Sequence, residues 1–369
     1  MQLSASPQQL GFRMPAEWEP HVRTWMCWPT DRCIWIGHEE IVPSDYARVA
    51  NAIAAFEPLT MLVQPRSFDE ARALLHPSVH VQALSIDDSW FRDTGPIFLV
   101  NDRGEKAAAL FTFNAWGERF QPYKDDALAG LRVLEAEGIA YVTSPLVMEG
   151  GGILTDGEGT LIVAESNVLN ANRNPGWTRA QADAEFKRLL GVEKVIWLPG
   201  DPYDAATDGH IDLIASFARP GVLVVGDAGD GSDPRSKIMR ENRRVLDLET
   251  DAKGRRFEIF SIPELGEEQA KGASLFCRAY VNYYIANGGV VIPAYGSPLD
   301  AVAAEVVAKA HPDRRVVQVD VGRIPFGGGG IHCITQQEPF CFARADTPPG
   351  LRRAEAAPAA QAGSRPARA

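Results

Sequence analysis

Apolar residues recur at helical spacing in several stretches of the chain. In the clearest one, Ser44 to Glu57, Val49, Ile53 and Phe56 fall on one face, and Pro58 ends the stretch. The other predicted helices are a short one opened by a Ser67–Glu70 capping box and reaching Leu75, one marked by Leu128, Leu131 and Leu134, one from a Thr178–Gln181 cap to Gly191, and one opened by Ser297, Pro298 and Asp300 that ends before Pro312.

Short pairs of β-rich segments lie between these helices, and the pairs resemble one another. Each has a polar or glycine-rich lead, an apolar strand, a turn of Asn, Asp, Gly or Pro, and a second apolar strand. The predicted strands are 97–100 with 107–113, 153–154 with 160–164, 213–217 with 222–225, and 285 with 290–293, and a last one, 334–335, precedes a polar turn at 336–339.

The leads of these units recur at a loose period of about 50 to 70 residues, which is typical of radial repetition. The lead residues are Asp93, Glu149, His210, Asn282 and Cys333. In a wheel of such units the equivalent strand ends converge on the axis. We therefore expect five polar residues to meet there: Asp93, Glu149, His210, Asp212 and Cys333.

Composition narrows the class of protein. The chain has 369 residues, 45% of them hydrophobic, and a formal charge of −11, so nucleic acid and anionic membranes are poor partners. It has neither a run of about 20 apolar residues nor a secretory signal at Met1–Pro15. Five cysteines without a pairing pattern indicate free thiols and a cytoplasmic protein. We expect one domain over 1–346 and a disordered Ala-, Pro- and Arg-rich tail over 347–369.

Cys333 follows a run of four glycines, Gly327–Gly330, and precedes the polar segment Thr335–Gln337. Glycines let a backbone pass close to a ligand, so a thiol placed just after them is open to close approach. This pattern favours a nucleophilic cysteine. The alternative is a buried structural cysteine beside a tight turn, since free cysteines are usually buried.

A second cluster is Asp208-Gly-His-Ile-Asp212. On a strand, residues 208, 210 and 212 would share one face, and His210 is the natural proton shuttle near neutral pH. The alternatives are an exposed polar strand face and a site for a hard divalent ion. We expect no metal, because the sequence offers no second cluster of comparable density.

Two further motifs precede predicted strands. In Trp90-Phe-Arg-Asp93, the Asp93 carboxylate could accept two parallel N–H bonds from a guanidinium, and Trp90 could pack on a cation or an alkyl chain. The alternative is an Arg92–Asp93 ion pair with Trp90 in the core. Glu149 stands before three glycines and could face a pocket, or it could simply belong to a turn. The glycine runs lack the phosphate-loop patterns.

Together these motifs resemble the agmatine deiminase family, over nearly all of the chain from Gly11 to about Pro339. The matching segments are Gly11–Pro15, Thr24–Pro29, Trp90–Pro96, Phe113–Gly117, Glu149–Gly151, Asp208–Asp212 and Gly328–Gln337. The resemblance implies the pentein fold, an α/β propeller of five blades with pseudo-fivefold symmetry. It also implies a homo-oligomer that acts on a small guanidine compound without a cofactor.

By this resemblance, Cys333 is the nucleophile, His210 the general acid and base, Asp93 and Asp212 the guanidinium clamp, and Glu149 a partner of both substrate and His210. The further substrate contacts expected are Trp90, Asp88, Asp208, Gly329 and Gly330. Cys333 would form a thiouronium with loss of ammonia, and water would release a ureido product. For agmatine that product is N-carbamoylputrescine.

The chain departs from the family pattern in three places. Residues 30–36 match only loosely, Gly330 stands where Asn is common, and the stretch after Gly117, over 118–124, is shorter than usual. These departures leave the substrate tail open. The alternatives are another alkylguanidine or peptidyl-arginine as substrate, an amidinotransferase of the same fold, a metal-dependent ureohydrolase, and a binding protein without catalysis.

Overall fold

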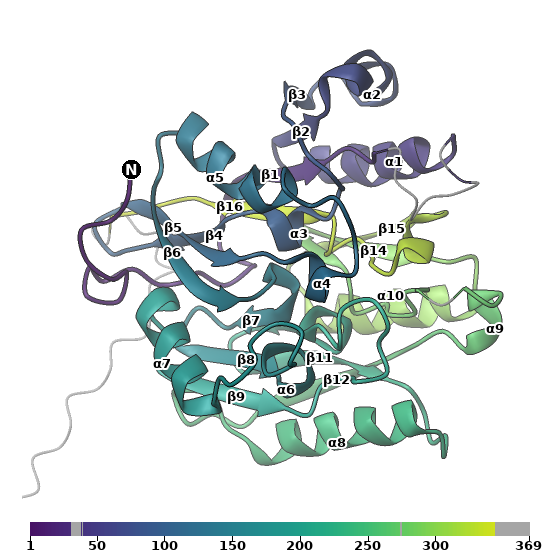
Figure 1. Ribbon diagram of the computed structural model, residues 1–369. Helices are drawn as coiled ribbons and strands as arrows, with labels where there is room; N and C mark the ends of the chain where they lie inside the picture. Colours follow the sequence, from purple (N-terminus) through teal and green to yellow (C-terminus); the bar gives the residue numbers. More distant parts are fainter. Residues whose placement is uncertain (31–37, 39, 274, 344–369) are drawn as a thin grey trace, which may run out of the picture.

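Five small sheets surround a common centre in the computed structural model, which describes residues 1–30, 38, 40–273 and 275–343 (Figure 1). The expectations for the 347–369 tail and for most of the 30–36 segment concern positions outside these ranges. The arrangement confirms the prediction of an α/β fold built from five repeated β units.

Four of the sheets share one topology. In the first, β4 (Ile97–Val100) pairs antiparallel with β5 (Lys106–Thr112), and β5 pairs parallel with β6 (Ala140–Val147) after a crossover through α5 (Asp126–Ala136). The same order recurs in β7 (Ile153–Thr155), β8 (Thr160–Ala164) and β9 (Lys194–Leu198), in β10 (Ala215–Arg219), β11 (Val222–Asp227) and β12 (Glu258–Pro263), and in β13 (Tyr284–Ala286), β14 (Gly289–Ala294) and β15 (Arg315–Asp320).

The fifth sheet joins the two ends of the described chain. Its order is β16 (Thr335–Pro339), β1 (His21–Cys27), β2 (Leu59–Val63) and β3 (His80–Ala83), with β16 antiparallel to β1. The predicted polar turn at 336–339 is therefore wrong. Its Glu338 is buried but paired, because it accepts hydrogen bonds from Trp25 Nε1 (2.9 Å) and Lys106 Nζ (2.5 Å).

The long predicted helices are all present. They are α1 (Val42–Ala54), α2 (Phe68–Leu74), α5, α7 (Arg179–Leu190) and α10 (Leu299–Ala310). The Thr178–Gln181 capping box is confirmed, but the Ser67 side chain makes no capping bond, because a 3₁₀ turn, η2 (Pro65–Ser67), leads straight into α2. The pattern did not predict α8 (Pro234–Leu248), whose N-cap Asp233 accepts a bond from Ser236 N–H.

Short helical turns connect these elements, and several of them carry the residues of the site. They are α3 (Phe91–Thr94), α4 (Ala115–Glu118), α6 (Glu165–Val168), α9 (Glu267–Ala270), η3 (Gly150–Gly152), η4 (Ile211–Leu213) and η5 (Ile324–Gly327). Within the described ranges, every helix is too short or too polar to span a bilayer.

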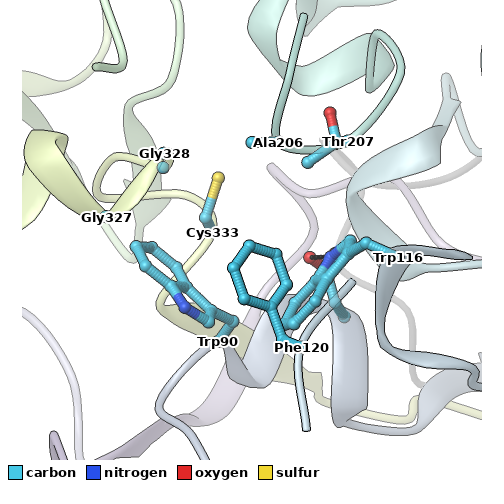
Figure 2. Close-up of a pocket in the computed structure, with 10 residues that line it drawn as sticks. Trp90, Trp116, Phe120, Ala206, Thr207, Gly327, Gly328 and Cys333 are labelled. Atoms are coloured by element: carbon cyan, nitrogen blue, oxygen red, sulfur yellow. Dashed lines mark hydrogen bonds between the residues drawn. The ribbon is translucent and has the colours of Figure 1, made fainter. Parts of the chain in front are cut away.

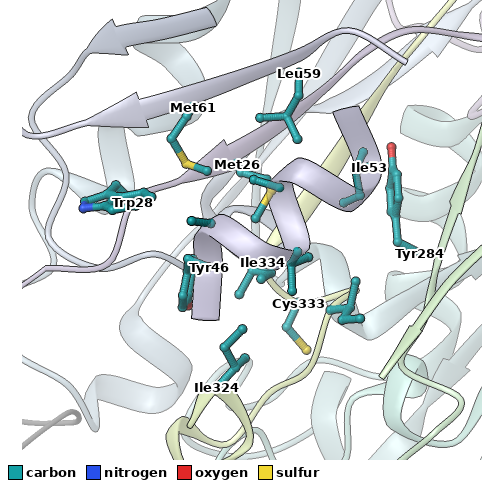
Figure 3. Packing of buried hydrophobic residues seen from close by; sticks show 14 of the residues in the cluster. Met26, Trp28, Tyr46, Ile53, Leu59, Met61, Tyr284, Ile324, Cys333 and Ile334 are labelled. Atoms are coloured by element: carbon teal, nitrogen blue, oxygen red, sulfur yellow. The ribbon is translucent and has the colours of Figure 1, made fainter. Parts of the chain in front are cut away.

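Apolar side chains fill the layers between sheets and helices, whereas the centre of the wheel is polar. Around α1, Met26, Ile53, Ile324 and Ile334 pack into one such layer, and Cys333 lies at its edge (Figure 3). Burying a large aliphatic side chain contributes about 1.5–3 kcal/mol, so this layer fixes the backbone on which the thiol stands.

Candidate active site

The blade leads bring the predicted residues together at the centre. Asp93 lies in α3, Glu149 directly precedes η3, His210 precedes η4, Asp212 lies within η4, and Cys333 follows η5. All five side chains are buried, with 8% or less of each residue exposed. Their convergence from positions far apart in the sequence is what radial repetition predicted.

The Cys333 thiol lies within contact distance of two polar residues. Its Sγ is 3.3 Å from Asn282 Nδ2, which donates to it, and 3.5 Å from Asp212 Oδ2, which accepts from it. Burial raises the pKa of the thiol well above 9, and the carboxylates of Asp212 and Asp93 raise it further. The resting residue is therefore a thiol, and only the arrival of positive charge would favour the thiolate.

His210 and Glu149 form a buried ion pair. His210 Nε2 is 3.2 Å from Glu149 Oε2, and His210 Nδ1 is 3.8 Å from Asp93 Oδ1. Burial opposes the charge on His210, but Asp93 and Glu149 outweigh it and raise its pKa to about 9. Burial likewise opposes the charge on Glu149, yet Arg173 and His210 lower its pKa to about 2. The imidazolium can thus donate a proton at neutral pH.

Asp93 is oriented by two donors. Its Oδ2 accepts from Trp116 Nε1 at 2.8 Å, and its Oδ1 accepts from Gly151 N–H at 2.9 Å. Trp116 has a left-handed backbone, with φ 56° and ψ 44°. That conformation is costly for a large side chain, so packing around the site must maintain it. Burial nevertheless raises the pKa of Asp93.

Three polar atoms face one point in front of Gly151. A Cβ atom built on Gly151 would lie 2.6 Å from His210 Nδ1, 2.9 Å from Asp212 Oδ2 and 2.9 Å from Asp93 Oδ1. Among the described residues, neither His210 Nδ1 nor Asp212 Oδ1 has a hydrogen-bond partner, although both are buried. Buried polar atoms without partners are rare, and here one donor and one acceptor mark a place where a polar ligand fits.

A pocket of about 310 Å³ leads to this point (Figure 2). Trp90, Trp116 and Phe120 form its aromatic side, and Cys333 lies near Gly327–Gly329. Asp93 is the charged residue of the described lining. Such a shape suits a cationic head near Cys333 and an apolar chain toward the mouth.

The expected substrate contacts separate into two groups. Trp90 and Gly329 line the pocket, and a Cβ on Gly329 would lie 2.5 Å from the Trp90 ring. Asp88, Asp208 and Gly330 lie outside that lining. Asp88 accepts from Ser89 N–H at 2.8 Å, and Gly330 packs against the Asn282 side chain. A substrate contact of these three stays a prediction that the lining does not support.

The strand face predicted for residues 208, 210 and 212 is wrong. Asp208 has a left-handed φ of 62°, Gly209 follows at 90°, and the chain then enters η4, so the side chains do not alternate along a strand. The Asp208 carboxylate instead accepts from Arg119 at 2.6 and 2.7 Å and from Arg173 at 2.5 Å. Since Arg173 also donates to Glu149 at 2.8 Å, Asp208 helps position the ion pair.

Some residues of the site escaped the sequence analysis. Asn282, which contacts the thiol, is the lead of the fourth unit, so the repeat itself could have identified it. Trp116 lies in the matched segment Phe113–Gly117. Nothing in the sequence singled out Glu17, which contacts His332, or Arg173, which donates to Glu149, because charged residues in loops are usually exposed. Within the part of the chain that the structure describes, no three His, Cys, Asp or Glu side chains form a cage that could hold a metal ion.

Comparisons with known proteins agree with this geometry. The chain is 39% identical to an agmatine deiminase of Ectopseudomonas mendocina over 91% of this chain and 98% of the relative, and 38% identical to one of Pseudomonas aeruginosa with the same coverage. A solved structure described as agmatine deiminase of Enterococcus faecalis catalyzing its reaction superposes with a TM-score of 0.88 at 33% identity, covering 92% of this chain and 99% of that one. The model of the Porphyromonas-type peptidyl-arginine deiminase family matches residues 13–339, and the chain therefore belongs to that family.

Proposed function

We propose that the protein is an agmatine deiminase, which converts agmatine and water into N-carbamoylputrescine and ammonia. The observation that carries the proposal is the convergence of Cys333, His210 and the two carboxylates of Asp93 and Asp212 on one buried point. Relatives of 38–39% identity over nine-tenths of the chain bear this name, which supports the same reaction here.

The guanidinium binds by charge and shape. Asp93 and Asp212 balance its charge and accept its N–H groups, which sets the guanidine carbon beside Cys333 Sγ. Its positive charge offsets the two carboxylates that raise the pKa of the thiol. Substrate binding thereby favours the thiolate next to the carbon it attacks.

The first half of the reaction forms a C–S bond and breaks a C–N bond. Cys333 attacks the guanidine carbon, and His210 donates a proton to the leaving nitrogen, which departs as ammonia and leaves a thiouronium. The thiol releases its proton to solvent when the guanidinium binds, so His210 is left neutral after it protonates the leaving nitrogen. In the second half, neutral His210 accepts one proton from water and the oxygen attacks the same carbon. The C–S bond then breaks, and the other proton of the water returns to the sulfur.

The pocket favours agmatine over arginine. Arg119, a cation that contacts the lining residues Trp116 and Ala206, is held by their carbonyls and by both carboxylate oxygens of Asp208. A buried α-carboxylate would therefore meet no available positive charge among the described lining residues. Placing a charge there without a partner is costly, so the decarboxylated substrate is preferred.

A substrate panel tests the proposal. The purified protein is incubated with agmatine, arginine, a peptidyl-arginine and a simple alkylguanidine, without an added amine, while ammonia and ureido product are measured. We expect kcat/KM to be at least about 100-fold higher for agmatine than for arginine. A dependence on an amine acceptor would indicate an amidinotransferase instead, and release of urea would indicate a ureohydrolase.

Replacing the nucleophile tests the mechanism. Cys333→Ala should lower kcat with agmatine by at least about 10⁴-fold, since no other group can form the thiouronium. Far-ultraviolet circular dichroism should show an unchanged fold. Undiminished ammonia release by this variant would refute the covalent route.

We also propose that the chain forms one domain over residues 1–346 and acts as a cytoplasmic homo-oligomer. The described cysteines Cys27, Cys277, Cys333 and Cys341 are all free thiols, which supports a reducing compartment. Light scattering coupled to size-exclusion chromatography measures the oligomeric state, and a monomeric mass would reject that part of the proposal.

A further inference from the structure

A second buried histidine, His332, lies beneath the site, next to the nucleophile in sequence. Only 6% of it is exposed. Its Nδ1 is 2.8 Å from Asp212 Oδ2, and its Nε2 is 2.8 Å from Glu17 Oε1. We propose that His332 is a positioning residue, a buried imidazolium that keeps Asp212 ionised and fixes this carboxylate with its Oδ2 facing the site; this inference rests on the proposed deiminase function.

Hydrogen-bond geometry carries the charge assignment. A neutral imidazole has one N–H donor and one bare nitrogen, which can only accept. Here both ring nitrogens lie 2.8 Å from carboxylate oxygens, so a neutral ring would set a lone pair against one of them. The doubly protonated ring satisfies both contacts as charge-assisted hydrogen bonds.

The surrounding charges agree with an imidazolium. Burial and Arg92 of α3 oppose the charge on His332, but Glu17 and Asp212 outweigh them and raise its pKa. Despite burial, His332 and Arg92 lower the pKa of Glu17 to about 2. The other titratable groups around the cluster are His21 and Tyr283 near Glu17, and His210, Asp93, Cys333 and Cys277 near Asp212.

The contact also orients Asp212. Its Oδ2 accepts from His332, which leaves Oδ1 buried and without a partner among the described residues. Burial alone would raise the pKa of Asp212, yet the hydrogen bond from His332 lowers it. The backbone of His332 is held as well, because its N–H donates to Asn282 Oδ1 at 3.0 Å and its carbonyl accepts from Arg92 Nε at 3.3 Å. The ring is thus a fixed support for one arm of the clamp.

Agmatine binding to the Cys333→Ala protein tests the role, because this variant binds without turnover. Calorimetry gives Kd between pH 5.5 and pH 8 with His332 present and with His332→Gln. Without the imidazolium the pKa of Asp212 rises, so its protonation should compete with the ligand at low pH. We expect the loss of affinity to be at least about tenfold greater at pH 5.5 than at pH 8, with proton release on binding near pH 6. An equal loss at all pH values would show a merely structural role and overturn the proposal.

Two further variants distinguish an effect on ligand binding from an effect on folding. Glu17→Gln leaves the ring in place but removes one carboxylate, and should change the pH dependence in the same direction by a smaller amount. His311→Gln is the matched control: His311 is buried to a similar degree and contacts Tyr283 rather than a carboxylate at the site, so it should affect stability alone. A pH dependence of Kd in the control equal to that of His332→Gln would contradict the proposal.

A readout without agmatine separates this inference from the proposed function. Nitrogen-15 spectra of histidine-labelled wild-type protein, assigned with His332→Gln, report whether both ring nitrogens of His332 carry protons at pH 7. We expect an imidazolium, and a neutral ring would overturn the proposal. If that imidazolium is present but neither binding nor turnover of agmatine is detected, the proposed function fails and the charge assignment stands.

Discussion

Two of the buried histidine–glutamate pairs in the described structure differ in how completely their polar atoms are hydrogen-bonded. In the first, His21 Nδ1 is 3.1 Å from both Glu57 oxygens, and His21 Nε2 bonds to the Glu17 carbonyl at 2.9 Å. Glu57 also accepts from Thr24 and Tyr284 and from the N–H of Asn287. Every ring nitrogen and carboxylate oxygen of this pair has a partner in the described structure.

The pair His210–Glu149 has the same residue types and a similar degree of burial, but one of its ring nitrogens has no hydrogen-bond partner in the described structure. His210 Nδ1 and the neighbouring Asp212 Oδ1 have no partner among the described residues. The complete set of hydrogen bonds lets the first pair link β1, the connection between α1 and β2, and β13, whereas the unpartnered atoms let the second pair bind a ligand. The residue types alone do not distinguish them, and the unpaired atoms do.

Exchanging each histidine for glutamine should have opposite effects. His210→Gln removes the proton donor and acceptor, so kcat with agmatine should fall about 10³-fold or more while the melting temperature changes little. His21→Gln should leave kcat within about twofold and lower the free energy of unfolding by about 2–4 kcal/mol, because it disrupts a buried network. Steady-state kinetics and urea unfolding measure the two effects. Equal losses of kcat in the two variants would contradict the assignment of one pair to catalysis and the other to stability.

Filling the point that the polar atoms face should also inactivate the enzyme. Gly151→Ala would place a methyl group 2.6–2.9 Å from His210, Asp212 and Asp93, and kcat/KM should fall about 10²-fold or more. Gly254→Ala is the control. Its Cβ would meet nothing within 4 Å, and at a φ of +80° the substitution should cost only about 1–2 kcal/mol of stability. Full activity of Gly151→Ala would show that substrate does not occupy this point.

The charge of Glu149 should affect the pH dependence of activity, whereas the charge of Glu57 should affect stability. Against the effect of burial, Asp93 and Glu149 together raise the pKa of His210 to about 9, so the rate should fall at pH values above that, where the imidazolium is lost. Glu149→Gln removes this negative neighbour, and we expect the alkaline limb of the kcat/KM profile to move to lower pH, with about 10²-fold lower activity at pH 8. If the alkaline limb stays at the same pH in this variant, Glu149 does not control the pKa of the proton donor.

Glu57→Gln is its counterpart at the saturated pair. Burial opposes the charge of Glu57, but the hydrogen bond from His21 lowers its pKa below 4.5. A depressed pKa contributes stability above the unfolded value, and that stability is lost as pH falls through the folded value. The stability deficit of Glu57→Gln should therefore be largest above about pH 4.5 and should shrink in more acidic solution, without movement of the alkaline limb.

The smallest expected effect concerns the orientation of Asp93. Trp116→Phe removes one of its two donors but keeps an aromatic ring in the pocket, so KM for agmatine should rise about tenfold with a smaller change in kcat. Steady-state kinetics measure both constants. An unchanged KM would mean that Gly151 N–H alone suffices to hold the carboxylate.

Radial repetition made much of this architecture predictable. The leads Asp93, Glu149 and His210 were placed correctly because each precedes a hairpin with clear turn signals, and Cys333 because its glycine-rich lead precedes the strand β16. Sequence reasoning failed where polar side chains find partners across blades. The strand Thr335–Pro339 resembled a turn because its side chains are mostly polar, and the donors that pair Glu338 lie far away in the sequence. Likewise, Asp208 was expected on a strand face, although Arg119 and Arg173 hold its carboxylate outside any strand. Such pairings depend on tertiary structure, which local pattern does not encode.

Because β16 and the preceding Cys333 lie near the C-terminal end of the described chain, the active site can assemble only late in synthesis. Ribosomes deliver chains from the N-terminus, and β1, which stands between β16 and β2 in its sheet, emerges more than 300 residues before β16. The segment that finally pairs with β1 begins two positions after Cys333. A nascent or truncated chain that ends before Cys333 has both an open sheet edge and no proposed nucleophile. Partial products of translation are therefore inert toward guanidines, and the finished ring and the reactive thiol arrive together.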